Sequence, residues 1–210
     1  MDAHEELLNV YDSAGQIVGS KPRREAKASG QAVGAINALI VNGRGELLMQ
    51  RRPGDKENGG YWDKSVGGHV SAGESFDETL VREAREELFD DPASTQVELL
   101  PSEAAFAARL ATAELSRVVL LRKVDQRLNL RDVRHAPDRQ GVRTVLYHLG
   151  IYLGRTEIAL AGFRPQASEI AELGYRPADE VDHLLLTGKL APNMAFLWLT
   201  QAHWLLEGLR

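Results

Sequence analysis

The chain has 210 residues, of which 43% are apolar and 26% charged, with a formal net charge of −5 and no cysteine. This balance is typical of a soluble globular protein, and the negative charge offers no general field for a nucleic-acid backbone, so no nucleic-acid partner is expected. The missing cysteines exclude disulfides, thiolate metal sites and cysteine nucleophiles, and the lack of a signal-peptide pattern or a long apolar run predicts a cytoplasmic protein with no membrane partner.

The first 30 residues are expected to form a hairpin and a connector. Apolar residues on both sides of the turn sequence at 12–15 predict a hairpin over residues 6–20. Residues 21–30 are polar and basic, which predicts a connector. We therefore divide the chain into an N-terminal hairpin with its connector (1–30) and a main domain with a helical C-terminal segment (31–210).

The main domain is expected to combine strands and helices without regular β-α-β alternation. In chain order its expected elements are strands at 32–42 and 46–51, an exposed loop at 53–61, a helix at 75–90, a helix-prone segment at 102–116, strands at 117–124 and 142–153 around a loop or hairpin tip at 126–141, a strand or helical turn at 168–173, and helices at 177–186 and 194–206. This order predicts a mixed sheet covered by helices. The last helix is apolar enough for burial on more than one side, with a homodimer contact as the alternative.

The helix at 75–90 has the clearest signals in the sequence. Ser75 followed by Glu78 is a capping box, in which each side chain satisfies a backbone N–H of the other residue. Pro92 predicts that the helix ends shortly before it.

Three glutamates of this helix share one narrow arc. At about 100° per residue, Glu83, Glu86 and Glu87 span roughly 100° of the helix circumference. An apolar arc lies beside them, and the opposite arc is expected to face solvent. The apolar arc contains Leu80, Val81, Ala84 and Leu88, and the solvent arc Glu78, Arg82 and Arg85. The glutamates are therefore predicted to lie at the border between core and water.

Carboxylates this close repel one another, and a cation offsets that repulsion. Hard oxygen ligands suit Mg²⁺ or Mn²⁺, which share their coordination between carboxylates and phosphate oxygens. The indicated chemistry is metal-assisted attack of water on a phosphoryl group. Arg82 stands four residues before Glu86, a spacing that allows an ion pair, and the pair Gly67-Gly68 lets backbone approach a metal or phosphate closely. Glutamate runs alone are more often solvated helix surface, and it is the glycines and the arginine that favour a site.

These residues resemble the Nudix box, a glycine-to-glutamate motif of diphosphate hydrolases. The matching positions are Gly68, Glu74, Arg82, Glu83, Glu86 and Glu87, with Ala84 at an aliphatic position. Phe89 and Asp90 depart from the motif, since they stand where it has a glycine and an aliphatic residue. Because that glycine usually ends the helix in a left-handed conformation, the helix must end here in another way.

The resemblance implies the Nudix fold, an α/β/α sandwich around a mixed sheet with the box as loop-helix-loop. It also implies that Glu86 and Glu87 are metal ligands, and that Glu83 is a ligand or the general base oriented by Arg82. A backbone carbonyl of Gly67 or Gly68 is implied as a further ligand. Glu74 is implied as a structural or metal-linked contact, and a downstream acidic ligand is sought among Glu169 and Glu172.

The N-terminal region resembles one branch of this family, the isopentenyl-diphosphate-isomerase-like proteins. That isomerase needs a cysteine before the Gly-His pair and metal-binding histidines upstream. This chain has Gly67 at that point, no histidine between His4 and His69, and no cysteine. We therefore expect the fold of the branch without its isomerase chemistry.

Several residues near the box are candidates for substrate binding. Arg51 and Arg52 alternate along a strand, so at most one faces a pocket, where it would bind phosphate. Trp62 is a candidate for stacking on a base or prenyl group, although rings in this setting more often pack in the core. His69 is a candidate for reaching the pocket, with a loop hydrogen bond as the alternative.

The leading functional prediction is cleavage of a diphosphate linkage in a nucleoside diphosphate joined to another group, or in a related organic diphosphate. The cofactor is Mg²⁺ or Mn²⁺ and the partner is this small-molecule substrate. The alternatives are a catalytically idle Nudix domain that binds a nucleotide-like ligand or a partner protein, and isopentenyl-diphosphate isomerase activity.

Overall fold

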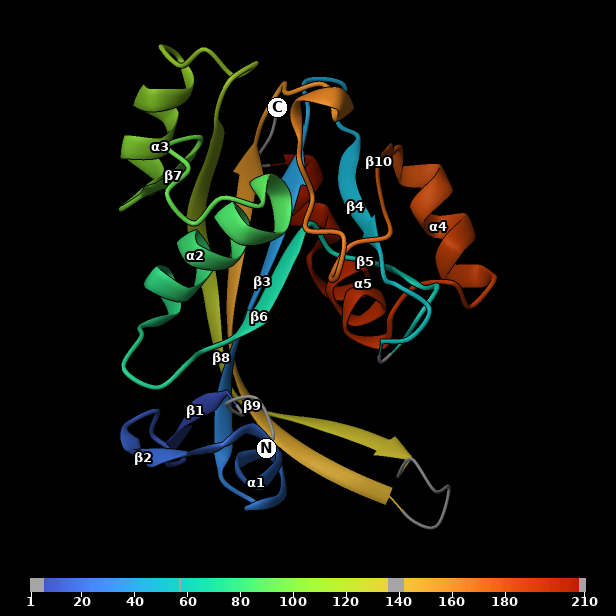
Figure 1. The fold of residues 1–210 in the computed structure, drawn as a ribbon. Helices are drawn as coiled ribbons and strands as arrows, with labels where there is room; N and C mark the ends of the chain where they lie inside the picture. Colours follow the sequence, from blue (N-terminus) through green and yellow to red (C-terminus); the bar gives the residue numbers. More distant parts are fainter. Residues whose placement is uncertain (1–5, 57, 136–141, 208–210) are drawn as a thin grey trace. The chain divides into compact units, whose positions relative to one another are not determined.

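A computed structural model describes residues 6–56, 58–135 and 142–207 (Figure 1). The chain forms two compact units whose segments interleave along the sequence. Unit 1 comprises Met1–Asn37, Gly68–Leu80 and Val124–Ile151, and unit 2 comprises Ala38–Gly67, Val81–Lys123 and Tyr152–Arg210. The predicted domain boundary at residue 30 stays a prediction.

The strands form a mixed sheet, as predicted. Its main path of paired strands is β10-β4-β3-β9-β8-β7. Pairs β10–β4 and β3–β4 are antiparallel, whereas β7–β8 is parallel. The strands of this path are β3 (Ala32–Val41), β4 (Leu47–Arg51), β7 (Val97–Leu100), β8 (Val119–His135), β9 (Val142–Arg155) and β10 (Glu172–Arg176).

Unit 1 contains the predicted N-terminal hairpin. Strand β1 (Leu7–Tyr11) pairs with β2 (Ile17–Pro22) on one side and with the start of β3 on the other. The prediction of a connector at 21–30 is wrong, because helix α1 (Arg23–Ala28) follows β2 directly. Its single buried residue, Ala26, packs into a cluster with Leu8, Val10 and Val33, so one small apolar side chain is enough to dock a short polar helix.

Unit 2 contains most of the helices. In α3 (Glu103–Leu110), Phe106 packs against Val118 and Leu120, and Figure 1 shows this helix beside β7. Helix α4 (Ala178–Leu186) is joined to α5 (Pro192–Glu207) by a hydrogen bond of 2.7 Å from Trp198 Nε1 to Asp182 Oδ1. The short strand β5 (Trp62–Asp63) pairs with β4, and the 3₁₀ turn η1 (Leu160–Gly162) precedes β10. No helix in the described part of the chain is long and apolar enough to cross a lipid bilayer.

The structure corrects four further expectations. Of the loop or hairpin tip expected at 126–141, residues 126–135 belong to β8, which passes through Asn129 in a left-handed conformation, and residues 136–141 lie outside the described part. For the strand or helical turn expected at 168–173, the structure has a turn at 167–169 and a strand at 172–176. Strands at 66–69 (β6, Val66–His69) and 97–100 were not expected. Helix α5 is not buried on more than one side over its described side chains, because Leu199 is 71% exposed while Leu197 is buried. The side chains beyond residue 200 lie outside the described part.

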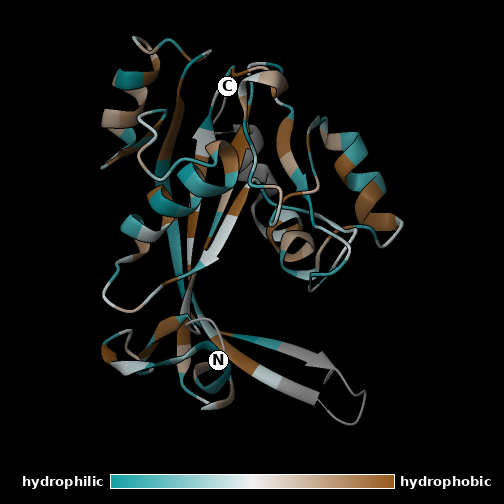
Figure 2. Cartoon of the chain, in the orientation of Figure 1, coloured by the Kyte–Doolittle hydropathy of each residue, from teal (hydrophilic) through white to brown (hydrophobic). Residues whose placement is uncertain are grey.

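Helix α2 (Phe76–Phe89) begins as predicted. The backbone N–H of Ser75 donates to Glu78 Oε2 (2.8 Å), and the N–H of Glu78 donates to Ser75 Oγ (3.2 Å), which completes the capping box. Both hydrophilic and hydrophobic residues occur along this helix (Figure 2), as expected for an element between core and water.

The helix ends without a glycine because Asp90 takes over its conformation. Asp90 has φ +48°, in the left-handed region, and the N–H of Asp91 donates to the carbonyl of Arg85 (3.3 Å). Aspartate tolerates this region better than most residues. The substituted position of the motif, Phe89, is buried instead and packs on Phe163 with ring centroids 5.6 Å apart.

Replacing Asp90 with glycine should therefore stabilise the fold. We expect Asp90→Gly to raise the free energy of unfolding by up to about 1 kcal/mol, because glycine has no steric penalty at positive φ. Asp91→Gly is the matched control and should lower stability, since it removes the Oδ1 acceptor of the Ala93 N–H (2.9 Å). Urea unfolding of both variants measures the difference, and a loss of stability in Asp90→Gly would contradict the account of the helix end.

Candidate active site

The three glutamates of α2 differ in exposure as the helix geometry predicts. The side chains of Glu83 and Glu86 are 16% and 31% exposed, and Glu87 is 8% exposed. On the same helix Ala84 and Leu88 are fully buried. The prediction that these carboxylates lie at the border between core and water is confirmed. The expectation that Arg85 faces solvent is wrong, because it is half-buried and its Nε is buried without a hydrogen-bond partner in the described part.

Glu87 is the best-defined acidic group of the site. Gln50 Nε2, from β4, and the backbone N–H of Gly67, from β6, both donate to its Oε2 at 3.2 Å. Within the described residues, Oε1 accepts no hydrogen bond. Two neutral donors thus hold one oxygen and leave the other for a further ligand.

Burial, and after it the negative charge of Glu83, raise the pKa of Glu87 to about 8, against the opposing effects of the Gly67 N–H and the Lys64 ammonium. A carboxylate that the protein buries with incomplete neutralisation is one that an added cation would stabilise. The residues present therefore fit a hard divalent cation in their chemistry.

A buried ion pair lies beside this group. Lys64 Nζ donates to Asp63 Oδ1 at 3.1 Å, and both side chains are almost fully buried. Arg52, which is half-exposed, donates to Asp63 Oδ2 at 3.3 Å. The Lys64 stem crosses Gly67 so closely that a Cβ there would lie 2.0 Å from Lys64 Cε. A side chain at residue 67 would therefore displace the end of the Lys64 side chain.

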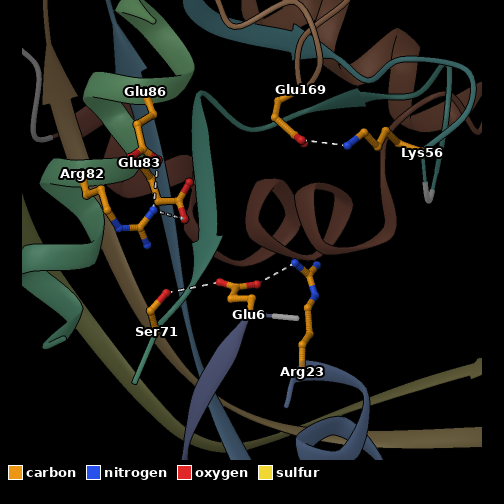
Figure 3. A network of polar contacts seen from close by, with 8 residues as sticks. All are labelled: Glu6, Arg23, Lys56, Ser71, Arg82, Glu83, Glu86 and Glu169. Carbon is orange, nitrogen blue, oxygen red and sulfur yellow. Dashed lines mark hydrogen bonds and ion pairs between the residues drawn. The ribbon is translucent and has the colours of Figure 1, made fainter. Parts of the chain in front are cut away.

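Arg82 connects the two other glutamates (Figure 3). Its guanidinium lies 3.1 Å from Glu83 Oε1 and 3.1 Å from Glu86 Oε2. The i,i+4 pair with Glu86 is the contact that the spacing predicts. Across the described ranges no three acidic or histidine side chains converge as a preformed cation site, and the guanidinium holds the carboxylates that a cation would share.

The downstream glutamates are held by basic side chains. Glu169 accepts from Lys56 Nζ at 2.7 Å (Figure 3), and Glu172 Oε2 pairs with Arg51 Nε at 2.9 Å and Nη2 at 2.8 Å. The structure does not place either one against the glutamates of α2. Trp62 is 9% exposed and the Arg176 guanidinium lies 4.3 Å from its ring centre, so one face of the ring is covered.

The remaining candidates belong to unit 1. Gly68 and His69 end β6, and the His69 ring lies 6.0 Å from that of Tyr147. Glu74 accepts a hydrogen bond of 2.8 Å from Thr79 Oγ1, which ties the residue before the helix to its first turn.

Sequence reasoning did not find Gln50, Asp63 or Lys64. The available signal was a polar residue inside the apolar strand LLMQR and a charged pair next to a tryptophan. Neither pattern indicates on its own that the side chain turns inward.

A sequence profile of the NUDIX domain matches residues 32–150. The chain is 39% identical over 84 residues to an uncharacterised Nudix hydrolase of Pseudomonas aeruginosa, and 35% identical over 85 residues to a Nudix hydrolase of Deinococcus radiodurans. Each alignment covers 40% of this chain and 50% of the relative, so the chain spans about half the length of the curated relatives it matches. The crystal structure of DR0079 from Deinococcus radiodurans aligns with 91% of this chain and 96% of its own, with a TM-score of 0.62 and 21% identity, which supports the same fold.

Stability without a metal should depend on pH through Glu87. In the unfolded chain this carboxyl ionises near its ordinary pKa of 4.5, whereas in the fold it stays protonated up to about pH 8. The folded state therefore binds more protons in this window, and its stability should fall as pH rises from about 5 to 8, at up to about 1.4 kcal/mol per pH unit.

Urea unfolding in EDTA across this window tests the assignment. Glu87→Gln should remove this part of the pH dependence. Glu98→Gln, at a glutamate whose pKa is lowered by Arg109, should keep it. If the free energy of unfolding changed with pH in the same way for the wild type and Glu87→Gln, Glu87 would be ionised in the fold and the prediction would be wrong.

Proposed function

The chain belongs to the Nudix family, and from this premise we propose that it is a hydrolase that cleaves a diphosphate linkage with Mg²⁺ or Mn²⁺ as cofactor. The proposed substrate is a nucleoside diphosphate joined to another group, or a related organic diphosphate. The observation that supports this most directly is the buried Glu87 carboxylate: within the described residues it accepts hydrogen bonds through Oε2 only, and the negative charge of Glu83 raises its pKa.

In this proposal the cation is bound by Glu83, Glu86, Glu87 and the backbone of Gly68. A bound divalent cation supplies polarisation of a phosphoryl oxygen and lowers the pKa of an attached water. Arg82 contacts both Glu83 and Glu86. It therefore orients whichever of these two carboxylates accepts the proton of the attacking water. Catalysis is accordingly assigned to Arg82, Glu83 and Glu86.

Substrate phosphate is best matched to Arg52. The guanidinium of Arg51 is engaged by Glu172 through two nitrogens, whereas Arg52 shares its acidic partner Asp63 with Lys64. A planar guanidinium can bind a phosphate through two of its nitrogens. Trp62 and His69 are proposed as further substrate contacts.

A substrate panel tests the proposal. Dinucleotides, nucleotide sugars, coenzyme A derivatives and nucleoside triphosphates are each assayed with Mg²⁺ and with Mn²⁺. We expect at least one class to be cleaved, and Glu86→Gln and Glu87→Gln to reduce its turnover by about a hundredfold or more while circular dichroism stays unchanged.

Glu98→Gln is the matched control, because it neutralises a glutamate of the same unit that pairs with Arg109 at 2.7 Å. It should keep its activity. Unchanged turnover in both Glu86→Gln and Glu87→Gln would refute the metal assignment. Failure of the wild type to cleave any of the compounds would favour a binding module.

A further inference from the structure

Asp63 is a buried acidic group that the proposed reaction leaves unused. Its side chain is 2% exposed, and its Oδ1 accepts from Lys64 Nζ at 3.1 Å and from the backbone N–H of Lys64 at 2.9 Å. The Lys64 side chain is 6% exposed, and among the described residues Asp63 is the one acceptor that its ammonium reaches. An ammonium has three donors, so a single bond to Asp63 decides where this buried charge lies.

The carboxylate of Glu87 lies near the same ammonium, with Gly67 as the neighbour of both. A Cβ at residue 67 would lie 2.9 Å from Lys64 Nζ, and the Gly67 N–H donates to Glu87 Oε2 at 3.2 Å. The charge of Lys64 lowers the pKa of Glu87 and that of Asp63 raises it, so both charges act on this carboxyl. Glu87 is therefore a second carboxylate in the surroundings of the ammonium.

The strand register places both carboxylates at one face of the sheet. Asp63 of β5 is the direct partner of Gln50 of β4. Directly paired residues of antiparallel strands project to the same face, and Gln50 Nε2 donates to Glu87 there. All of these residues belong to unit 2. The ammonium of Lys64 thus has two carboxylates on this face, and it is bonded to Asp63.

An ammonium bonded to Glu87 would compete with a divalent cation. It would offset the negative charge that attracts the cation, and its own positive charge would repel it. Lysine is a point charge on a flexible stem of four carbons, so rotation of its last bonds is enough to change its acceptor. In the fold, Glu87 instead receives its hydrogen bonds from the neutral donors Gln50 and Gly67.

We propose that Asp63 is a positioning residue that holds the Lys64 ammonium away from Glu87 and so keeps this carboxylate available to a divalent cation. The cation in this inference rests on the proposed function, whereas the placement of Lys64 does not. It follows that the exchange of one atom group, Asp63→Asn, turns Lys64 into a competitor of the cation.

Three variants of the full chain test this: Asp63→Asn, Lys64→Met and the double variant Asp63→Asn/Lys64→Met. Methionine keeps an unbranched side chain without the charge. Arg52, which donates to Asp63 Oδ2 at 3.3 Å, loses this acceptor in both variants that contain Asp63→Asn, so a difference between those two belongs to Lys64. Glu98→Gln, at an acid that pairs with Arg109 in the same unit, is the matched control.

The first readout is the dissociation constant for Mn²⁺, measured by electron paramagnetic resonance at a temperature where circular dichroism shows every variant folded. We expect Asp63→Asn to bind Mn²⁺ about tenfold or more weakly, with Lys64→Met, the double variant and Glu98→Gln close to the wild type. If the double variant stays as weak as Asp63→Asn, Lys64 is not the competitor and the proposal fails. If Lys64→Met tightens binding as much as Asp63→Asn weakens it, the two charges act only through space and the proposal also fails.

The second readout is the crystal structure of Asp63→Asn without metal. We expect Lys64 Nζ within hydrogen-bonding distance of Glu87, and an ammonium that stays on residue 63 or turns elsewhere would overturn the proposal. Where Asp63→Asn does not fold alone, both measurements are made in trimethylamine N-oxide, which favours the folded state. If the wild type binds no Mn²⁺, the proposed function fails, and the position of Lys64 in this crystal still decides whether Asp63 holds the ammonium.

Discussion

The buried carboxylate of Glu87 is the constraint on which the rest of this structure depends. An acidic group taken out of water costs free energy unless donors or a cation offset the loss. Here Gln50 and Gly67 supply two neutral hydrogen bonds to one oxygen, and nearby Glu83 adds repulsion. The divalent cation proposed above would offset the remaining cost of burying this carboxylate.

The surrounding elements can be understood as support for this group. Strand β4 contributes Gln50, strand β6 contributes the Gly67 amide, and α2 places Glu87 between them. Lys64 crosses the glycine with its ammonium on Asp63, which brings a fixed positive charge into the same region. Arg82 then keeps Glu83 and Glu86 together on the neighbouring turns.

The sequence was sufficient for what depends on local periodicity and spacing. The capping box, the arc of glutamates and the Arg82–Glu86 pair follow from helix geometry alone, and the structure has all three. It was not sufficient where the partner lies far away in the chain: Gln50 is 37 residues from Glu87. Tertiary contacts also explain why two polar segments are regular. In α1, Ala26 packs into a buried cluster, and in β8 the polar residues after 124 continue the strand.

The central claim, proposed above, is that Glu87 binds a divalent cation through Oε1, which accepts no hydrogen bond within the described residues. Anomalous diffraction from a crystal soaked in Mn²⁺ measures this directly. The account predicts a peak bonded to Glu87 Oε1, with Oε2 still held by Gln50 and Gly67. A crystal with Mn²⁺ bound elsewhere, or with Glu87 unchanged and no peak beside it, would contradict it.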